Sequence, residues 1–275
     1  MPEGPEIRRA ADRIAKVVQG RVIERVEFGL PRLQEFEGML SGVKVNELET
    51  RGKALLTHFD NDLTLYSHNQ LYGRWYVVKR DRLPKTNRSL RVALHTATHS
   101  ALLYSASDIE VLTADELTTH KFLARIGPDI LSQELTPERV VQQLEDAKFS
   151  GRKLAHLYLD QGFLAGVGNY LRSEILFEAR VNPNLRPKDL SPALRSALGE
   201  ATIEISKRAY KTAGITNDLE RVAQLKEQGM KRSQFRHHVF ARQSRRCYEC
   251  GTKVTKVELS GRRLYYCASC QSVPE

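Results

Sequence analysis

The stretch that decides the C-terminal fold reads Cys247-Tyr248-Glu249-Cys250 and, sixteen residues later, Cys267-Ala268-Ser269-Cys270. Two Cys-x2-Cys pairs at this separation are typical of four-cysteine zinc sites, and the residues between them can pair as a β-hairpin. The alternatives are two disulfides or reduced thiols without a metal. We expect one structural Zn2+ per chain, because four thiolates leave no open coordination position for water.

The basic residues are concentrated around the same hairpin. The 275-residue chain has a formal net charge of +10, and the window from Lys231 to Arg263 holds ten Lys or Arg against two Glu. An excess of positive charge in one window indicates a polyanionic partner, most simply nucleic acid.

The rest of the composition excludes several classes of protein. No run of eighteen apolar residues exists, so no membrane span is expected. The charged N-terminus is unlike a signal peptide, so we expect a cytoplasmic protein, where clustered cysteines favour metal over disulfides.

The apolar pattern changes twice along the chain. Helical spacing over residues 5–19 is followed by about seven short alternating segments between Val22 and Ser105, which favours a sandwich or barrel. After Leu112 the pattern is helical, with helices expected over 136–148, 153–160, 169–179 and 191–210. Gly127-Pro128-Asp129 marks a boundary. The predicted domains are 1–126 (β-sandwich), 127–237 (helical) and 238–275 (cysteine hairpin).

A glycine-rich turn, Gly162-Phe163-Leu164-Ala165-Gly166-Val167-Gly168-Asn169, joins two of these helices. Closely spaced glycines let a backbone approach a ligand, and a helix N-terminus offers N–H donors to an anion. The turn could bind phosphate or serve only as a compact connection. It is not a P-loop, because no Gly-Lys-Ser/Thr follows.

The N-terminus begins Met1-Pro2-Glu3. Excision of Met1 would leave a secondary amine on Pro2, which can attack an aldehyde-like carbon to give an iminium ion, with Glu3 as an adjacent acid or base. Spacing alone favours ordinary surface residues at these positions.

Five motifs together carry a resemblance. They are MPEGPE at the start, Arg51-Gly52-Lys53, His68-Asn69-Gln70-Leu71-Tyr72-Gly73, the stretch Leu159–Tyr170, and Gly261-Arg262 ahead of Cys267. Taken in order over nearly the whole chain, they resemble the formamidopyrimidine-DNA glycosylase and endonuclease VIII family of base-excision repair enzymes. The resemblance implies an α+β multidomain fold: an N-terminal β-sandwich flanked by helices, and a C-terminal helical domain with a helix–two-turn–helix element and a four-cysteine zinc ribbon.

The resemblance also implies a catalytic set. Pro2 looks like the nucleophile that attacks the deoxyribose C1′, and Glu3 like the acid that assists opening of the sugar ring. Lys53 looks like the acid/base and phosphate contact of β-elimination, although by itself it could be a solvated lysine. Arg262 looks like the residue associated with δ-elimination; Arg263 beside it departs from the family pattern.

Further positions resemble DNA contacts. Gln70, Leu71 and Tyr72 resemble the wedge that fills the hole left by a flipped nucleotide, although Leu71 and Tyr72 could instead be core strand residues. Asn169 resembles a phosphate contact. Arg125 matches another DNA-contacting position, and could otherwise pair with a nearby acid.

The function implied is a bifunctional DNA glycosylase and abasic-site lyase, acting as a monomer on double-stranded DNA with oxidised bases or abasic sites. The wedge sequence is unlike the Met-containing wedge of the oxidised-purine branch, so oxidised pyrimidines are favoured over 8-oxoguanine. The alternatives are an oxidised-purine glycosylase and a non-catalytic DNA-binding protein of the same fold.

A bacterial, nucleoid-associated location would follow from the implied function. Residues 215–235 match the family poorly, in a region that is commonly a mobile lesion-covering loop.

Overall fold

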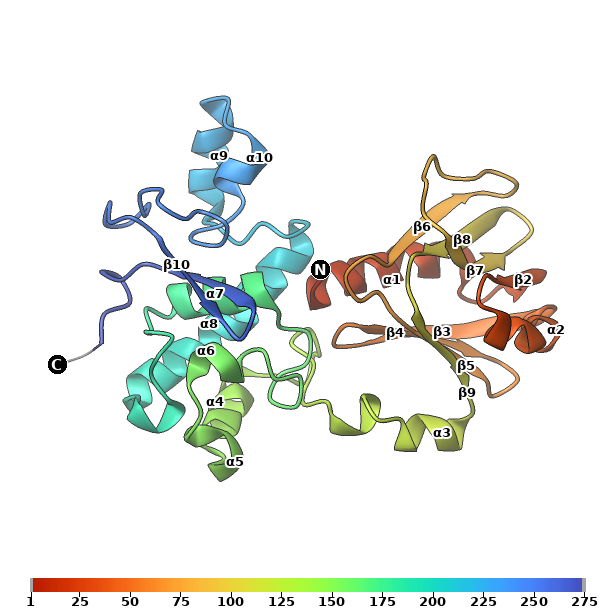
Figure 1. Cartoon of the computed structure of the whole chain (residues 1–275), viewed down its shortest axis with the longest axis horizontal. Coiled ribbons are helices and arrows are strands. Elements are labelled where there is room, and N and C mark those ends of the chain that lie inside the picture. The colour runs from red at the N-terminus through yellow and green to blue at the C-terminus, as the bar shows by residue number, and fades with distance from the viewer. Residues whose placement is uncertain (1, 274–275) are drawn as a thin grey trace. The chain divides into compact units, whose positions relative to one another are not determined.

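The structure, a computed structural model, describes residues 2–273. The chain divides into two compact units, Met1–Ile126 and Gly127–Glu275 (Figure 1). Within the described residues, no helix combines the length and the apolar character that crossing a membrane requires.

Unit 1 is built on two antiparallel sheets. The five-stranded sheet has the order β1-β3-β4-β5-β9, and the four-stranded sheet has the order β2-β7-β8-β6. The strands of the first sheet are β1 (Val22–Ile23), β3 (Val43–Arg51), β4 (Ala54–Phe59), β5 (Thr64–His68) and β9 (Asp108–Leu112). Those of the second are β2 (Arg25–Phe28), β7 (Leu90–His95), β8 (His99–Tyr104) and β6 (Arg74–Lys79).

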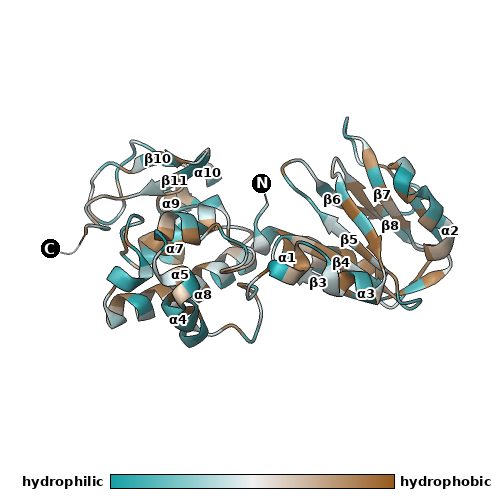
Figure 2. Ribbon diagram, turned by 60° about the horizontal axis from the view of Figure 1, so that its bottom comes forward, coloured by the Kyte–Doolittle hydropathy of each residue, from teal (hydrophilic) through white to brown (hydrophobic). Residues whose placement is uncertain are grey.

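The core of unit 1 lies between these sheets. Side chains alternate between the faces of a strand, so Val26 and Phe28 are buried while Arg25 is exposed. They join Leu55 and Leu65 from the other sheet in one apolar cluster, and Figure 2 shows apolar residues concentrated along the strands of both sheets. The β-sandwich predicted from the alternation is therefore confirmed.

Helices cover the sandwich. Helix α1 (Gly4–Val18) packs against strands of both sheets and contributes Ile14 to their shared core. The outer face of the five-stranded sheet is covered near Leu123, which belongs to the 3₁₀ helix η2 (Leu123–Arg125). The remaining helices are η1 (Pro31–Phe36), α2 (Glu37–Leu40) and α3 (Ala114–Thr119).

The observed strands differ from the sequence prediction at two places. The first of the alternating segments, Val22–Phe28, predicts one strand, but it is interrupted at Glu24, so that its halves enter different sheets. Strand β9 was not predicted, although Ile109 and Val111 alternate with charged residues. The signal is short, and five residues are near the lower limit of a recognisable period.

Unit 2 is helical with one hairpin. Its helices are α4 (Pro137–Glu145), α5 (Ala147–Ser150), α6 (Leu154–Leu157), α7 (Asn169–Glu178), η3 (Pro187–Asp189), α8 (Pro192–Lys211), α9 (Leu219–Glu227) and α10 (Arg232–Phe235). Strands β10 (Thr255–Leu259) and β11 (Arg262–Tyr266) form the hairpin.

The helix starts of unit 2 follow ordinary capping chemistry. Thr136 Oγ1 accepts a hydrogen bond from the Arg139 N–H at 3.3 Å, with Pro137 in the first turn. The predicted helix 136–148 is divided at Asp146, which ends α4 and caps α5 by accepting from the Lys148 N–H at 2.7 Å. The helix predicted over 153–160 shortens to the single turn of α6.

Residues 215–235, where the resemblance suggested a mobile loop, contain the helices α9 and α10. Ile215, Val222 and Phe235 form a small apolar cluster between them. Neither helix was predicted, although Leu219, Val222 and Leu225 recur at helical spacing after Asp218, which caps α9; the signal is only two turns long.

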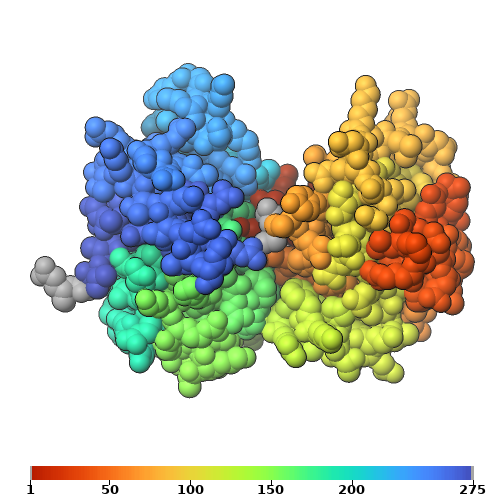
Figure 3. Space-filling model, in the orientation of Figure 1, coloured from red at the N-terminus to blue at the C-terminus, as the bar shows by residue number. Residues whose placement is uncertain are grey.

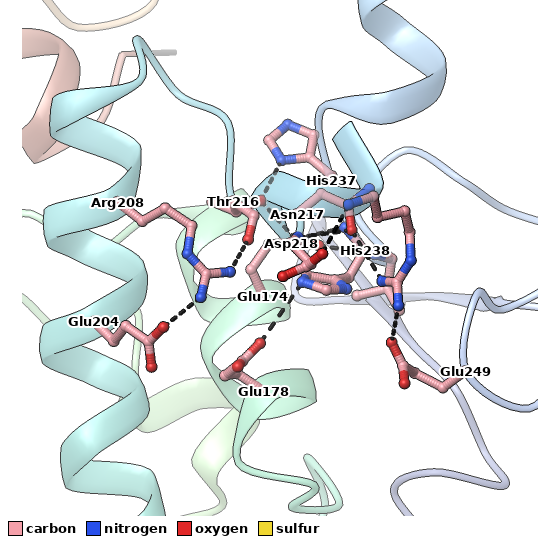
Figure 4. A network of polar contacts seen from close by, with 12 residues as sticks. Glu174, Glu178, Glu204, Arg208, Thr216, Asn217, Asp218, His237, His238 and Glu249 are labelled. Atoms are coloured by element: carbon pink, nitrogen blue, oxygen red, sulfur yellow. Dashed lines mark hydrogen bonds and ion pairs between the residues drawn. The ribbon is translucent and has the colours of Figure 1, made fainter. Parts of the chain in front are cut away.

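A fully buried carboxylate ties α7 to the chain that leads into the hairpin (Figure 4). Glu174 accepts three backbone N–H bonds, from His238 at 2.7 Å, Val239 at 2.9 Å and Phe240 at 2.8 Å. The Thr216 hydroxyl donates a fourth at 2.6 Å. Burial raises the pKa of Glu174, while these four hydrogen bonds act in the opposite direction.

We predict that Glu174→Ala lowers the free energy of unfolding of unit 2 by about 3 kcal/mol, because it leaves several buried donors without an acceptor. The control is Glu204→Ala, which removes a mostly exposed carboxylate that pairs with Arg208. That change should cost less than about 1 kcal/mol. Urea titration followed by far-UV circular dichroism measures both, and equal effects would contradict the role given to Glu174.

Candidate functional site

The start of α1 holds the first two candidates. Glu3 is 3% exposed, and its N–H donates to Glu6 Oε2 at 3.1 Å. The Glu3 carbonyl accepts from the N–H groups of Glu6 and Ile7, which begins the helix. Pro2 precedes it and is half-buried; Met1, whose excision the sequence suggests, lies outside the described residues. Glu3 is therefore fixed at the helix start and screened from water.

Lys53 lies in the tight turn between β3 and β4. Gly52 has φ +61°, a conformation that favours glycine. The Lys53 side chain is 7% exposed, so the alternative of a solvated lysine is wrong. A lysine is rarely this buried without a polar role.

The packing of α1 brings its first turn toward this lysine. Helix α1 packs on β3, and its C-terminal end is fixed there because the Gly20 N–H donates to the Val45 carbonyl at 2.8 Å. The helix is about 22 Å long, and β3 covers about 20 Å from Val45 to its end. Glu3 and Lys53 therefore lie at the same end of unit 1, as Figure 1 shows for the elements that carry them.

His68 lies at the same end of the five-stranded sheet. It pairs in register with Ala54 on one side and Asp108 on the other. Burial lowers the pKa of His68, with the charge of Lys53 acting in the same direction and Asp108 opposing it. Burial also raises the pKa of Asp108. The strand pairing thus places a lysine, a histidine with a lowered pKa and a carboxyl group close together.

The loop after His68 projects two apolar side chains. Leu71 is 58% and Tyr72 is 68% exposed, so the alternative that they are core strand residues is wrong. Gln70 is exposed and has φ +49°, which is uncommon for a residue with a side chain. Large apolar groups held out in solvent indicate a contact surface.

Arg125 is exposed at the end of η2. The segment before it is attached to the same part of the sheet: Leu123 packs with Ala54, and the ring of Phe122 meets the ring of His68 edge-on at 5.8 Å between centroids. The Arg125 side chain is thus carried by a segment anchored beside His68.

In unit 2, the glycine-rich turn is held by the Gln161 side chain. Its Nε2 donates to the carbonyls of Leu159 at 3.1 Å and Val167 at 3.0 Å, and its Oε1 accepts from the Gly166 N–H at 3.0 Å. Asn169 follows as the first residue of α7 and is half-buried. The turn therefore presents the N-terminus of α7 in a fixed conformation.

The hairpin tip carries two exposed arginines. Ser260 and Gly261, with φ +49° and +70°, form the two-residue turn typical of a tight hairpin. Arg262 and Arg263 follow at the start of β11.

The four cysteines lie around one point. Their Sγ atoms are within 4.8 Å of one another, with Cys247 and Cys270 at 3.9 Å and Cys250 and Cys267 at 3.4 Å. These distances are too long for disulfides. Four thiolates around a tetrahedral zinc would be about 3.8 Å apart, so the cluster fits a metal ion of that size.

Sequence reasoning missed the residues that attach the hairpin to α7. Arg172, fully buried, donates from Nη1 to the Ala155 carbonyl and from Nη2 to the Arg263 carbonyl at 3.0 Å. Ser173 Oγ accepts from the Tyr265 N–H at 3.2 Å. The sequence did carry a signal, a run of polar residues between Leu171 and Ile175. Its meaning depends on the burial of α7 on all sides, which the structure shows.

The candidates thus fall into two groups. The structure brings Pro2, Glu3, Lys53 and the Gln70–Tyr72 loop to one end of unit 1. Asn169, Arg262 and the cysteines belong to unit 2.

Comparisons with known proteins give matches over most of the chain. Residues 1–108 match the formamidopyrimidine-DNA glycosylase N-terminal domain, and residues 126–220 match the formamidopyrimidine-DNA glycosylase H2TH domain. Endonuclease 8 of Escherichia coli (strain K12 / DH10B) is 50% identical over 271 residues, which cover 98% of this chain and 100% of that protein. Endonuclease 8 of Salmonella arizonae is 49% identical over the same coverage.

Solved structures show the same fold. Lactococcus lactis formamidopyrimidine-DNA glycosylase, non-covalently bound to DNA that contains an abasic site, superposes with a TM-score of 0.81 at 21% identity, covering 98% of this chain and 100% of that one. The same glycosylase in complex with DNA that contains an oxidised pyrimidine also has a TM-score of 0.81, at 21% identity, with 99% and 100% covered. With half of its residues identical to endonuclease 8 over almost its whole length, this chain belongs to the formamidopyrimidine-DNA glycosylase and endonuclease 8 family.

Proposed function

We propose that the protein is a bifunctional DNA glycosylase and abasic-site lyase of base-excision repair that removes oxidised pyrimidines. The observation that carries the proposal is the burial of two charged groups, Glu3 and Lys53, at the end of unit 1 where the chain begins. Buried ionisable groups near an amine nucleophile are typical of a catalytic site.

Pro2 is the nucleophile in this proposal. With Met1 removed, its secondary amine attacks the deoxyribose C1′, and the damaged base leaves with the electrons of its bond to C1′ and takes up the proton that the amine loses. The iminium ion then forms as the bond from C1′ to the ring oxygen breaks. Glu3 donates a proton to the ring oxygen as the sugar opens. The iminium acidifies the C2′ hydrogen, and loss of that proton expels the 3′ phosphate.

Lys53 and Arg262 act on the phosphates. Lys53 serves as acid/base and phosphate contact in the β-elimination. Arg262 at the hairpin tip assists the second, δ-elimination, in which the 5′ phosphate leaves. Positioned cations stabilise the charge that develops on each leaving phosphate.

The remaining candidates bind DNA. A base inside a duplex must be extruded before it is attacked. Leu71 and Tyr72 would fill the vacated space by stacking, and Gln70 would hydrogen-bond to the orphaned base. Asn169 at the start of α7 and the exposed Arg125 would contact phosphates.

The cysteine cluster takes one structural Zn2+. Cys247, Cys250, Cys267 and Cys270 would hold the ion, which would fix the hairpin that presents Arg262. We further propose that unit 2 comprises a helical domain, 127–237, and a zinc ribbon, 238–275, and that the protein acts as a cytoplasmic, nucleoid-associated monomer.

Within the proposed function, one prediction concerns the nucleophile. A protein with a free Pro2 amine, incubated with abasic-site DNA and borohydride, should form a covalent adduct seen by gel electrophoresis. The same chain with an uncleaved N-terminal extension should form none, because the Pro2 nitrogen is then an amide. Both forms should bind DNA with a tetrahydrofuran abasic analogue. Equal trapping of the two forms would refute Pro2 as the nucleophile.

The second prediction separates the two arginines of the tip. Arg262→Ala should lower the rate of δ-elimination by about 100-fold, since removing one positioned group typically costs that much. The β-elimination product should accumulate. Arg263→Ala removes the same charge one residue away and should leave the ratio of β to δ products unchanged. Denaturing gels of end-labelled abasic DNA report that ratio; a similar shift in both variants would indicate general charge only.

The third prediction concerns the lesion. Single-turnover rates should be higher on duplexes with thymine glycol than on duplexes with 8-oxoguanine, because the wedge lacks the methionine of the oxidised-purine branch. The reverse order would assign the chain to oxidised purines. Trapping on abasic DNA without release of either base would favour a lyase alone.

A further inference from the structure

The loop of residues 69–73 has a defined shape of its own. Its ends are joined because the Gly73 N–H donates to the Asn69 carbonyl at 2.7 Å. A Cβ on Gly73 would lie 2.5 Å from the same carbonyl oxygen, so only glycine allows this closure. The Gln70 N–H donates to His68 Nδ1 at 3.1 Å. We call residues 70–72 the wedge.

Strand register places a serine beside the first wedge residue. His68, the last residue of β5, pairs with Asp108, the first residue of β9. The residues just beyond this pair, on either strand, are therefore neighbours. Ser107 Oγ donates to Gln70 Oε1 at 2.9 Å. Ser107 is itself held, since its carbonyl accepts from Arg32 Nη2 at 3.1 Å.

The four-stranded sheet places an arginine beside the last wedge residue. Strands β6 and β7 both pair with β8, and Arg74 and Leu90 both lie opposite Tyr104. Tyr72 and Arg88 each precede their strand by two residues, so they lie at the same end of the sheet. Arg88 Nη1 donates to the Tyr72 carbonyl. Figure 3 shows the segment around residues 70–90, in orange, at the surface of unit 1.

We propose that Ser107 and Arg88 are positioning residues that hold the wedge in its inserting shape before DNA binds. In this proposal Ser107 also determines whether Oε1 or Nε2 of the Gln70 amide faces the orphaned base. The inference rests on the proposed function, because it takes residues 70–72 as the group that enters the DNA.

The consequence concerns the base opposite the lesion. The hydrogen bond turns Gln70 Oε1 toward Ser107, so Nε2, on the other side of the planar amide, is the group left to face the orphaned base. The wedge then offers a donor and recognises an acceptor. Every base has an acceptor on its Watson–Crick edge, so the enzyme should tolerate different opposite bases.

Base analogues test this directly. The three duplexes carry a tetrahydrofuran site opposite adenine, purine or 1-deazaadenine. Purine lacks the N6 donor of adenine, and 1-deazaadenine lacks its N1 acceptor. For the wild type, loss of the acceptor should weaken binding by about three- to tenfold, the range of one hydrogen bond, whereas loss of the donor should change it less than about twofold. In Ser107→Ala the freed amide should use both groups, so purine should become several-fold weaker than adenine.

Two variants separate positioning from a general structural effect. Ser107→Thr keeps the hydroxyl and should restore the wild-type pattern. Gln70→Ala should bind the three duplexes alike. Fluorescence anisotropy measures these affinities without catalysis, so failed borohydride trapping would refute the proposed chemistry while leaving this test intact. The same analogue pattern in Ser107→Ala as in the wild type would overturn the role of Ser107.

The matched pair for Arg88 is Arg88→Ala and Arg82→Ala. Both remove one charge from the same loop, but Arg82 is exposed and follows the end of β6 that lies away from the wedge. With 2-aminopurine as the orphaned base, stopped-flow fluorescence should show insertion slowed several-fold in Arg88→Ala and unchanged in Arg82→Ala at equal DNA saturation. Equal rates in the two variants would overturn the role of Arg88.

Discussion

The C-terminal half of the molecule depends on one buried carboxylate. Glu174 gathers three consecutive backbone N–H groups, at residues 238–240, and the Thr216 hydroxyl onto the middle of α7. Isolating an acid from water is costly, and the cost is offset only when its oxygens are fully hydrogen-bonded. These hydrogen bonds therefore fix the path of the backbone from the helical core into the cysteine hairpin.

The same helix carries the elements proposed to contact DNA. Asn169 opens α7, and Arg172 and Ser173, in its next turn, hold strand β11 by its backbone. Arg262 at the tip thus projects from a hairpin that α7 holds by its backbone and that the proposed zinc ion would hold at its cysteines. A rigid mount suits a residue whose proposed task is to meet one particular phosphate.

The sequence could predict the parts whose signal is local. Paired cysteines, the alternation of strands such as β2 and the capped start of α4 follow from spacing and composition alone, and the family resemblance supplied the candidate residues. The placement of those residues could not follow from spacing. Burial of Lys53 depends on the pairing of β3, β4 and α1, and the contact of Ser107 with Gln70 depends on the register of β5 and β9. Interactions between residues 37 positions apart leave no local pattern. Glu174 was missed because a polar residue on a helix normally indicates an exposed face.

The exposure of Leu71 and Tyr72 explains why their loop must be stiff. Apolar side chains gain free energy by leaving water, so a flexible loop would lay them against the nearest sheet surface. Here the loop is closed by Gly73, and its two ends are braced from separate sheets through Ser107 and Arg88. The free protein thereby keeps its apolar groups in solvent, and that unfavourable exposure is relieved when they enter a stacked duplex. A pre-formed wedge also loses less conformational entropy on insertion. The strand ends that position Lys53 and His68 thus also hold the wedge in its exposed conformation. The residues for the proposed chemistry and for the proposed extrusion of the base therefore belong to one unit of the fold.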